Sequence, residues 1–323
     1  MKKVVYFAGL FLLIMLLAAC GSNTNNEESV PAAPNTGSGT EAPDTNEEAA
    51  TEGDTITYQS ETGPVEIPAN PQRIVALTNA PNVLSLEGHV VGVDQWTQAN
   101  PLFTERLEGV KVVSEADFEE ILDLDPDLII AGSHMETIAE LEKIAPTVVY
   151  TWGKLDYLEQ QLEIGKLLNK EQETQEWIDD FTARAAAVGE EVKGEFGEDV
   201  SVSVFETDSK NFSVFGANWA RGTEILYQAM GLSMPEKART DTLDVGYYNL
   251  SLEVIPDYAG DFIILSRPAA SETSYMDTEV WKSIPAVQND RVITIDLEAS
   301  TYSDPISLET MLGTFQEGML GSQ

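Results

Sequence analysis

The feature that most limits how this chain can fold is a long segment without proline near its middle. Residues 155–196 contain no proline, and apolar residues recur there at helical spacing, as at Leu158 and Leu162. The segment predicts one bridging helix over residues 155–196, which is long for a globular protein. The alternative is two consecutive helices with a break or kink near Asn169-Lys170.

Short apolar runs alternate with helical patterns on both sides of this segment. The predicted strands are residues 73–77, 90–93, 127–131 and 147–150 before it, and 200–205, 212–215, 261–265 and 291–295 after it. Helices are predicted at 223–230 and 308–319 in the second half. Strands that alternate with helices are typical of βαβ units and a largely parallel sheet. We therefore expect an α/β protein with an N-terminal lobe over residues 56–154 and a C-terminal lobe over residues 197–323.

Composition excludes several classes of function. The chain of 323 residues has 55 acidic and 18 basic residues, a formal net charge of −37, and therefore repels nucleic acid. One cysteine rules out a disulfide framework, and two histidines far apart disfavour capture of free zinc or manganese. A lipid-anchored enzyme is a weaker alternative, because the chain has no Gly-x-Ser-x-Gly elbow, phosphate loop or zinc-protease motif.

The first residues have the pattern of an export signal. Lys2 and Lys3 precede an apolar run that is short for a membrane span, and residues 17–20 read Leu-Ala-Ala-Cys. This ending resembles a bacterial lipobox, so we expect a signal peptide over residues 1–19 and lipidation of Cys20. The alternative is a plain signal peptide with a chance cysteine. The polar, acidic residues after Cys20 predict a disordered tether over 20–55, because they bury too little apolar surface to offset ordering entropy.

One internal repetition links the two halves. Glu119 precedes Asp127-Leu-Ile-Ile by eight residues, and Glu253 precedes Asp261-Phe-Ile-Ile by the same number. Both glutamates can therefore occupy equivalent places on two similar lobes and match two basic pockets of a symmetric partner. The alternative is that both are ordinary solvated residues of a Glu-rich chain.

Several segments together carry a resemblance to a known family. They read NPQRIVAL (70–77), ILDLDPDLII (121–130), NWARGTEILY (218–227), VWKSIPAV (280–287) and SDPISLE (303–309). With the lipobox and tether, they resemble the iron–siderophore substrate-binding lipoproteins of Gram-positive ABC importers, and in particular the ferric-hydroxamate binders. The resemblance runs from about Val65 to the C-terminus.

The resemblance implies a class III periplasmic-binding-protein fold, with two Rossmann-like lobes bridged by one long helix and the ligand in the interlobe cleft. It implies a monomer, lipid-anchored through Cys20 at the outer face of the cytoplasmic membrane. Glu119 and Glu253 would dock onto arginines of the permease, and ATP hydrolysis would occur in a separate subunit. The protein would need no cofactor, because the iron arrives already chelated.

Five residues are candidates for the ligand site. A ferric hydroxamate is bulky and has little net charge, so its site needs aromatic walls and a few donors to the iron-bound oxygens. In the resembling family the Trp-x-Arg position contacts the ligand, which assigns Trp219 and Arg221 to the site. Trp152 and Tyr302 lie where the hydroxamate subgroup has aromatic residues, and Trp96 is a weaker candidate. Trp177 and Trp281 are assigned to packing.

Other chelates remain alternatives within the same importer class. Ferric catecholates and carboxylates carry strong negative charge and would need clustered basic residues, of which only Arg221 can be assigned to the cleft. Haem would need an axial ligand, for which Tyr302 is available without an accompanying motif. Cobalamin is a further alternative.

Overall fold

The computed structural model describes residues 54–208 and 211–321. The predicted signal peptide, Cys20 and nearly all of the predicted tether lie outside these residues. Within the described part of the chain, no helix is both long and apolar enough to cross a membrane.

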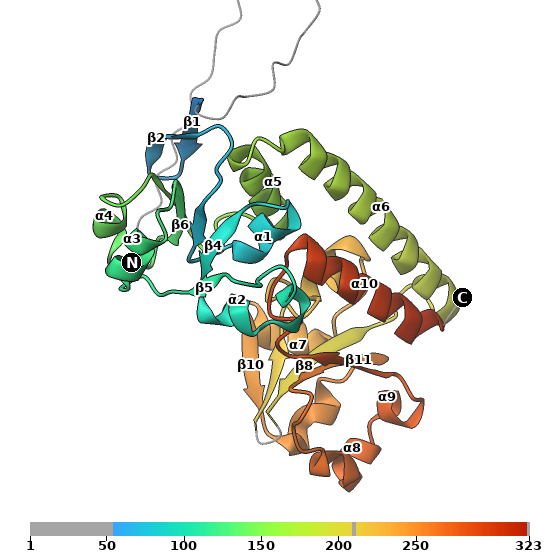
Figure 1. Ribbon diagram of the computed structural model, residues 1–323. Coiled ribbons are helices and arrows are strands. Elements are labelled where there is room, and N and C mark those ends of the chain that lie inside the picture. The colour runs from blue at the N-terminus through green and yellow to red at the C-terminus, as the bar shows by residue number, and fades with distance from the viewer. Residues whose placement is uncertain (1–53, 209–210, 322–323) are drawn as a thin grey trace, which may run out of the picture. The chain divides into compact units, whose positions relative to one another are not determined.

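The N-terminal lobe is built on a parallel sheet of five strands in the order β5-β4-β3-β6-β7 (Figure 1). Alternate residues face opposite sides, so that Ile74 and Leu128 join one buried cluster while Val75 and Ile129 join another. Both faces of the central strands are therefore covered, as expected of a parallel sheet. The elements are β3 (Ile74–Ala76), α1 (Ala80–Ser85), β4 (Val90–Val93), α2 (Gln95–Ala99), η1 (Pro101–Phe103), β5 (Lys111–Val112), α3 (Phe118–Asp123), β6 (Leu128–Gly132), α4 (Ile138–Leu141) and β7 (Thr147–Tyr150).

An antiparallel hairpin, which the sequence patterns did not predict, precedes this lobe. It consists of β1 (Thr55–Ser60) and β2 (Gly63–Pro68). The Tyr58 hydroxyl lies 2.9 Å from the Tyr150 hydroxyl and donates to Glu163 at 3.0 Å. Burial raises the pKa of Tyr58 to about 12. The hairpin is thereby attached to the end of β7 and to the helix that follows.

The segment predicted as one helix over 155–196 is two helices, α5 (Tyr157–Leu167) and α6 (Glu171–Phe196). Asn169 has a φ of 56°, which an α-helix cannot accommodate. The prediction of a single helix is wrong in this respect, and the alternative break near Asn169-Lys170 is correct. The long helix of the fold is α6 alone, with 26 residues (Figure 1).

The C-terminal lobe has a mixed sheet in the order β10-β9-β8-β11-β12. Strands β8, β11 and β12 are parallel, whereas β9 runs antiparallel to both of its neighbours, β8 and the edge strand β10. The sequence patterns missed β10, because three of its four residues are exposed and give no apolar run. The strands are β8 (Val202–Thr207), β9 (Phe212–Phe215), β10 (Tyr247–Leu250), β11 (Phe262–Arg267) and β12 (Val292–Asp296).

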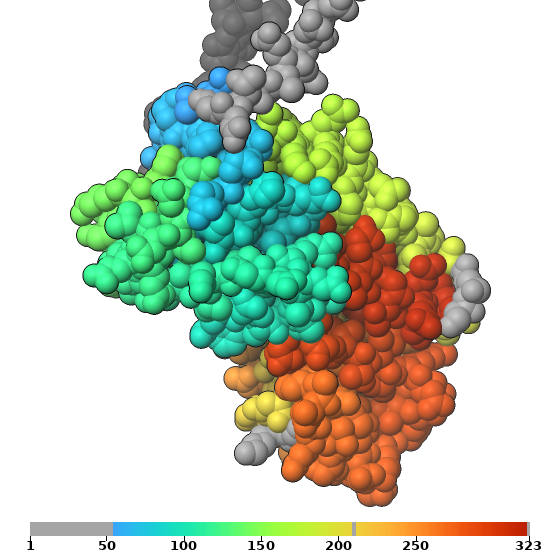
Figure 2. Space-filling view, viewed as in Figure 1, coloured from blue at the N-terminus to red at the C-terminus, as the bar shows by residue number. Residues whose placement is uncertain are grey.

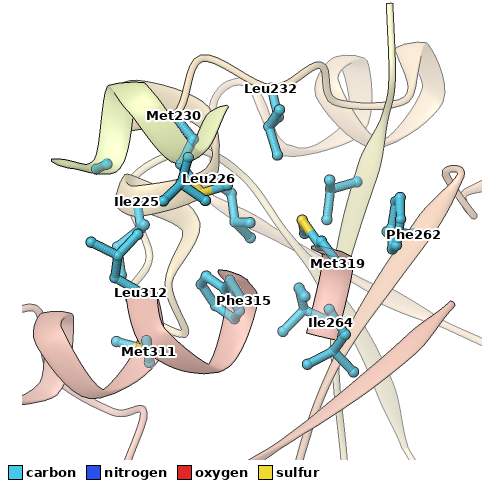
Figure 3. Packing of buried hydrophobic residues seen from close by; sticks show 14 of the residues in the cluster. Ile225, Leu226, Met230, Leu232, Phe262, Ile264, Met311, Leu312, Phe315 and Met319 are labelled. Atoms are coloured by element: carbon cyan, nitrogen blue, oxygen red, sulfur yellow. The ribbon is translucent and has the colours of Figure 1, made fainter. Parts of the chain in front are cut away.

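A well-packed core joins the helices of this lobe to the sheet. Phe315 of α10 is fully buried and lies in one cluster with Ile225, Leu226 and Ile264 (Figure 3). The predicted helix over 223–230 is a short π-helix, η2. The elements are η2 (Glu224–Ala229), α7 (Glu236–Thr242), η3 (Leu252–Asp257), η4 (Ser274–Asp277), α8 (Glu279–Lys282), α9 (Pro285–Gln288) and α10 (Pro305–Leu320).

The segment before α10 connects the two lobes. The Asn100 side-chain amide donates to the Glu298 carbonyl oxygen at 2.8 Å, and Tyr302 and Ile306 pack against the N-terminal core. Figure 2 shows the red surface of the C-terminal segment between the teal N-terminal lobe and the yellow-green α6. The lobes therefore meet through side chains as well as through α5 and α6.

Candidate ligand-binding site

Four aromatic rings from both lobes form a continuous cluster. Trp152 follows β7, and its ring centroid lies 5.2 Å from that of Trp219 in an edge-to-face arrangement of 85°. Trp219 lies 5.4 Å from Tyr247, which in turn lies 6.3 Å from Phe215. The other two pairs are tilted at 39° and 42°, and aromatic contacts at these separations are favourable. The structure thus brings together Trp152 and Trp219, which the sequence placed in the site.

Tyr247 was missed by the sequence reasoning. It is the first residue of β10 and is 40% exposed. Two successive tyrosines after a glycine, Gly246-Tyr247-Tyr248, were the available signal. Their place beside Trp219 depends on pairing between β9 and β10, in which Tyr247 lies opposite Phe215.

Trp219 begins an unusual left-handed turn. The three following residues Ala220, Arg221 and Gly222 have φ angles of 56°, 55° and 78°. This conformation is unfavourable for residues with a Cβ atom, so other contacts must maintain it. At Gly222 a Cβ atom would lie 2.4 Å from the Phe315 ring, which explains the glycine.

Three consecutive backbone N–H groups donate hydrogen bonds that hold this turn. Trp219 donates to the Thr223 hydroxyl at 3.0 Å, and Ala220 donates to the Glu224 carboxylate at 3.0 Å. Arg221 donates to the Ser300 carbonyl oxygen at 2.9 Å. The orientations of Trp219 and Arg221 are therefore fixed by the lobe before any ligand arrives.

The buried carboxyl group of Glu224 is part of this support. Its side chain accepts a second hydrogen bond from the Thr223 hydroxyl at 3.1 Å. Burial raises the pKa of Glu224 despite these hydrogen bonds. Burial and the charge of Glu224 also raise the pKa of Tyr157, the first residue of α5. The turn is thus electrostatically linked to the start of the helices that bridge the lobes.

Arg221 is already paired within the C-terminal lobe. Its Nε donates to the Glu206 carboxylate at 2.7 Å, and its guanidinium lies 5.1 Å from the Phe215 ring centroid. A guanidinium has five N–H donors, so the two terminal nitrogens can still donate to a ligand. The structure therefore shows a donor whose charge is compensated by Glu206, a partner that the sequence did not indicate.

Tyr302 and Trp96 are not members of the four-ring cluster. The Tyr302 hydroxyl lies 3.3 Å from the Thr97 hydroxyl, and its ring contacts Phe103 at 6.3 Å. Burial raises the pKa of Tyr302. Trp96 is 67% exposed on the first turn of α2, where Asp94 caps the helix. Tyr302 therefore packs between the lobes, and Trp96 presents a free ring on the N-terminal lobe.

The tryptophans assigned to packing do pack. Trp281 is 3% exposed in the core of the C-terminal lobe. Trp177 stacks on Phe181 at 5.1 Å, and its indole N–H donates to Glu309 at 3.0 Å.

The residues proposed for docking occupy matching positions. Glu119 is exposed on α3 of the N-terminal lobe, and Glu253 is exposed on η3 of the C-terminal lobe. In both lobes the aspartate eight residues after the glutamate accepts a hydrogen bond from a backbone N–H just before a neighbouring strand. Asp127 accepts from the N–H of Arg73, and Asp261 accepts from the N–H of Ser201, each at 2.9 Å. Hydrogen bonds from its own backbone N–H and from Ser251 lower the pKa of Glu253.

Two concavities on the surface lie away from the aromatic cluster. One of about 330 Å³ is lined by residues of α6 and α10, and one of about 100 Å³ is lined in part by Trp177. None of the cluster residues lines either of them. Within residues 54–208 and 211–321, no group of three His, Cys, Asp or Glu side chains is placed to hold a metal ion.

Comparison with known proteins agrees with this architecture. Residues 75–299 match the model of the periplasmic binding protein family. The iron(3+)-hydroxamate-binding protein FhuD of Bacillus subtilis is 32% identical over 95% of this chain and 95% of its own length. The iron(3+)-hydroxamate-binding protein YxeB of the same organism is 32% identical over 95% of this chain and 94% of its own.

Solved structures of similar proteins have the same fold as this chain. The FhuD protein from S. pseudintermedius superposes with a TM-score of 0.75 at 31% identity, over 83% of this chain and 99% of its own. FhuD2 from Staphylococcus aureus with bound ferrioxamine B gives a TM-score of 0.72 at 32% identity, over 77% of this chain and 98% of its own. The two α/β lobes, the long α6 and these matches show that the chain belongs to the periplasmic binding protein family, whose members are substrate-binding components of transport systems and not enzymes.

Proposed function

We propose that this protein binds ferric hydroxamate siderophores between its lobes and delivers them to an ABC permease. The observation that carries the proposal is the interlobe contact between Trp152 and Trp219, flanked by Tyr247 and the fixed guanidinium of Arg221. Aromatic walls suit the organic shell of a fully chelated iron, and terminal guanidinium N–H groups suit its hydroxamate oxygens. Relatives at 32% identity carry the name of iron(3+)-hydroxamate-binding proteins, which supports the same ligand class.

The local charges favour a ligand of low net charge. Arg221 is compensated by Glu206, and Lys154, two residues after Trp152, pairs with Glu61 at 3.2 Å. A ferric catecholate carries several negative charges and would need cations that are not already paired with carboxylates. Hydroxamates satisfy the site with donors alone, and the protein then needs no cofactor of its own.

Delivery to the membrane involves both lobes and the N-terminal segment. Glu119 and Glu253 would each meet a basic pocket of the permease, so that docking positions the ligand cleft over the translocation path. Lipidation of Cys20 would anchor a monomer at the outer face of the cytoplasmic membrane, with the acidic segment 20–55 as tether and a separate subunit as ATPase. Relatives named as substrate-binding or siderophore-binding lipoproteins support this placement.

Fluorescence titration of the purified full-length chain tests the proposal. Ferrioxamine B, ferrichrome, a ferric catecholate and haemin are added separately, with calorimetry as an independent readout. We expect saturable quenching by the two hydroxamates at stoichiometric amounts, with less quenching after Trp152→Phe and unchanged quenching after Trp177→Phe. If only the catecholate or only haemin binds, the assignment to hydroxamates is wrong and that chelate is the ligand. If none of the four compounds binds, the proposal is refuted.

A further inference from the structure

An exposed apolar turn borders the aromatic cluster. Residues 243–247 connect α7 to β10 and read Leu-Asp-Val-Gly-Tyr. Leu243 is 78% exposed, Val245 is 56% exposed and Tyr247 is 40% exposed. We name these three side chains the apolar rim. Single exposed apolar residues are common, but three within five residues beside a candidate site require an explanation.

The turn is fixed against the site by Gly246. Its N–H donates to the Thr242 carbonyl oxygen at 2.8 Å, and its carbonyl oxygen accepts from Gly216 at 2.7 Å. Gly246 has a φ of 79°, and a Cβ atom there would lie 2.3 Å from the Trp219 indole. The indole therefore lies directly on the backbone of the turn. The apolar rim has a defined position relative to Trp219.

The apolar rim is also continuous with the aromatic wall. Tyr247 belongs to both, because its ring lies 5.4 Å from Trp219 and 6.3 Å from Phe215. Leu243 and Val245 precede Tyr247 by four and two residues in the same turn, and both are exposed aliphatic side chains. The turn that contacts Trp219 thus also carries exposed aliphatic surface that a ligand can cover.

We propose that the apolar rim determines specificity by contacting the aliphatic spacers of linear ferric trihydroxamates. This inference rests on the function proposed above and adds a preference within that ligand class. Hydroxamates joined by linear chains of methylene segments and amides present mainly aliphatic surface, whereas hydroxamates carried on a peptide ring add the amides of that ring. Leu243 and Val245 gain free energy by covering methylene groups, and they offer no hydrogen bond to an amide.

The test compares two ligands on matched variants of the full-length chain. Calorimetry measures the affinities for ferrioxamine B, which has aliphatic spacers, and for ferrichrome, which has a peptide ring. For Leu243→Asn with Val245→Asn we expect about a tenfold loss of affinity for ferrioxamine B and less than about twofold for ferrichrome. The control Leu122→Asn changes a leucine that is 60% exposed on α3 and should leave both affinities unchanged.

Several outcomes would overturn the inference. Unchanged affinities, or equal losses for both ligands, would remove the apolar rim from ligand selection. Normal affinities with lost uptake would assign it to the permease instead. If the double variant fails to fold, the near-isosteric Val245→Thr should still weaken ferrioxamine B binding by about threefold, and no change would count against the inference. Failure of the unmodified chain to bind any ferric hydroxamate would instead refute the function on which this inference rests.

Discussion

The two lobes hold their parts of the candidate site in different ways. In the C-terminal lobe, Trp219 lies on the backbone of Gly246 and begins a turn in which the N–H groups of Trp219, Ala220 and Arg221 are hydrogen-bonded. In the N-terminal lobe, Trp152 is 75% exposed and its loop is attached through the partly exposed Lys154–Glu61 ion pair. Exposed ion pairs contribute little to stability. The C-terminal wall is thus preformed by buried and hydrogen-bonded groups, whereas the N-terminal ring is exposed and is held by weaker contacts.

The two lobes also differ in their buried carboxyl groups. Among the described residues, the buried carboxyl groups are Glu224 and Asp304, and both belong to the C-terminal lobe. Asp304 caps α10, and burial raises its pKa. A buried carboxyl group is unfavourable unless hydrogen bonds compensate, so such groups indicate a locally rigid structure.

The largest expected effect tests whether the lobes are equal partners in docking. Glu119→Arg combined with Glu253→Arg should abolish siderophore uptake, because each lobe would then repel a basic pocket. Ligand affinity should remain within about twofold, since both residues are exposed outside the aromatic cluster. Radioactive iron uptake by cells and calorimetry measure the two properties. Glu105→Arg with Glu198→Arg is the matched control for added charge, and normal uptake by the first pair would reject the docking sites.

The next prediction compares the two tryptophans directly. Trp219→Ala should weaken ferrioxamine B binding by about 100-fold, because it removes the central ring of the preformed wall. Trp152→Ala should weaken binding by about tenfold, because an exposed ring loses more side-chain entropy when it is ordered by a ligand. Calorimetry provides both values. Trp219→Phe keeps the partly buried position filled if the alanine variant unfolds, and an equal or larger loss at Trp152 would contradict the assigned asymmetry.

A pair of glycines tests the same difference through the backbone. Gly246 and Gly153 have φ angles of 79° and 75°, so alanine should destabilise each by about 1 kcal/mol. At Gly153 a Cβ atom meets nothing within 4 Å, whereas at Gly246 it meets the Trp219 ring. We therefore expect Gly246→Ala to weaken ligand binding by about fivefold and Gly153→Ala to change it by less than about twofold. Similar binding by both variants would show that Gly246 does not position Trp219.

The smallest expected effect concerns the pH dependence of stability. Because burial raises the pKa of Glu224 above its ordinary value of 4.5, the folded protein holds this proton more tightly than the unfolded chain. Its contribution to the free energy of unfolding therefore falls as pH rises above 4.5 toward the folded pKa. Glu224→Gln should remove this fall and change stability at neutral pH by only about 1 kcal/mol. Urea unfolding across this pH range measures it, and parallel curves for the two proteins would contradict the prediction.

The sequence by itself determined the fold class and most of the strands. Short apolar runs located β4, β7 and β9 to the residue, because strands of a covered sheet are rich in apolar residues. It missed the exposed edge strand β10 and the hairpin β1–β2, whose patterns are not dominated by burial. It predicted one bridging helix where the structure has two, because the apolar pattern continues past Asn169 and only the backbone there shows where the first helix ends.

For the candidate site, residue types were available from the sequence and their partners were not. Trp152 and Trp219 were selected through the resemblance to the ferric-hydroxamate binders, and their predicted roles in ligand binding await the titration. Their mutual contact, the pairing of Arg221 with Glu206 and the addition of Tyr247 were decided only by the tertiary structure. The physical reason is that local patterns encode burial and backbone conformation, whereas these contacts join side chains whose distance depends on how strands pair and lobes meet.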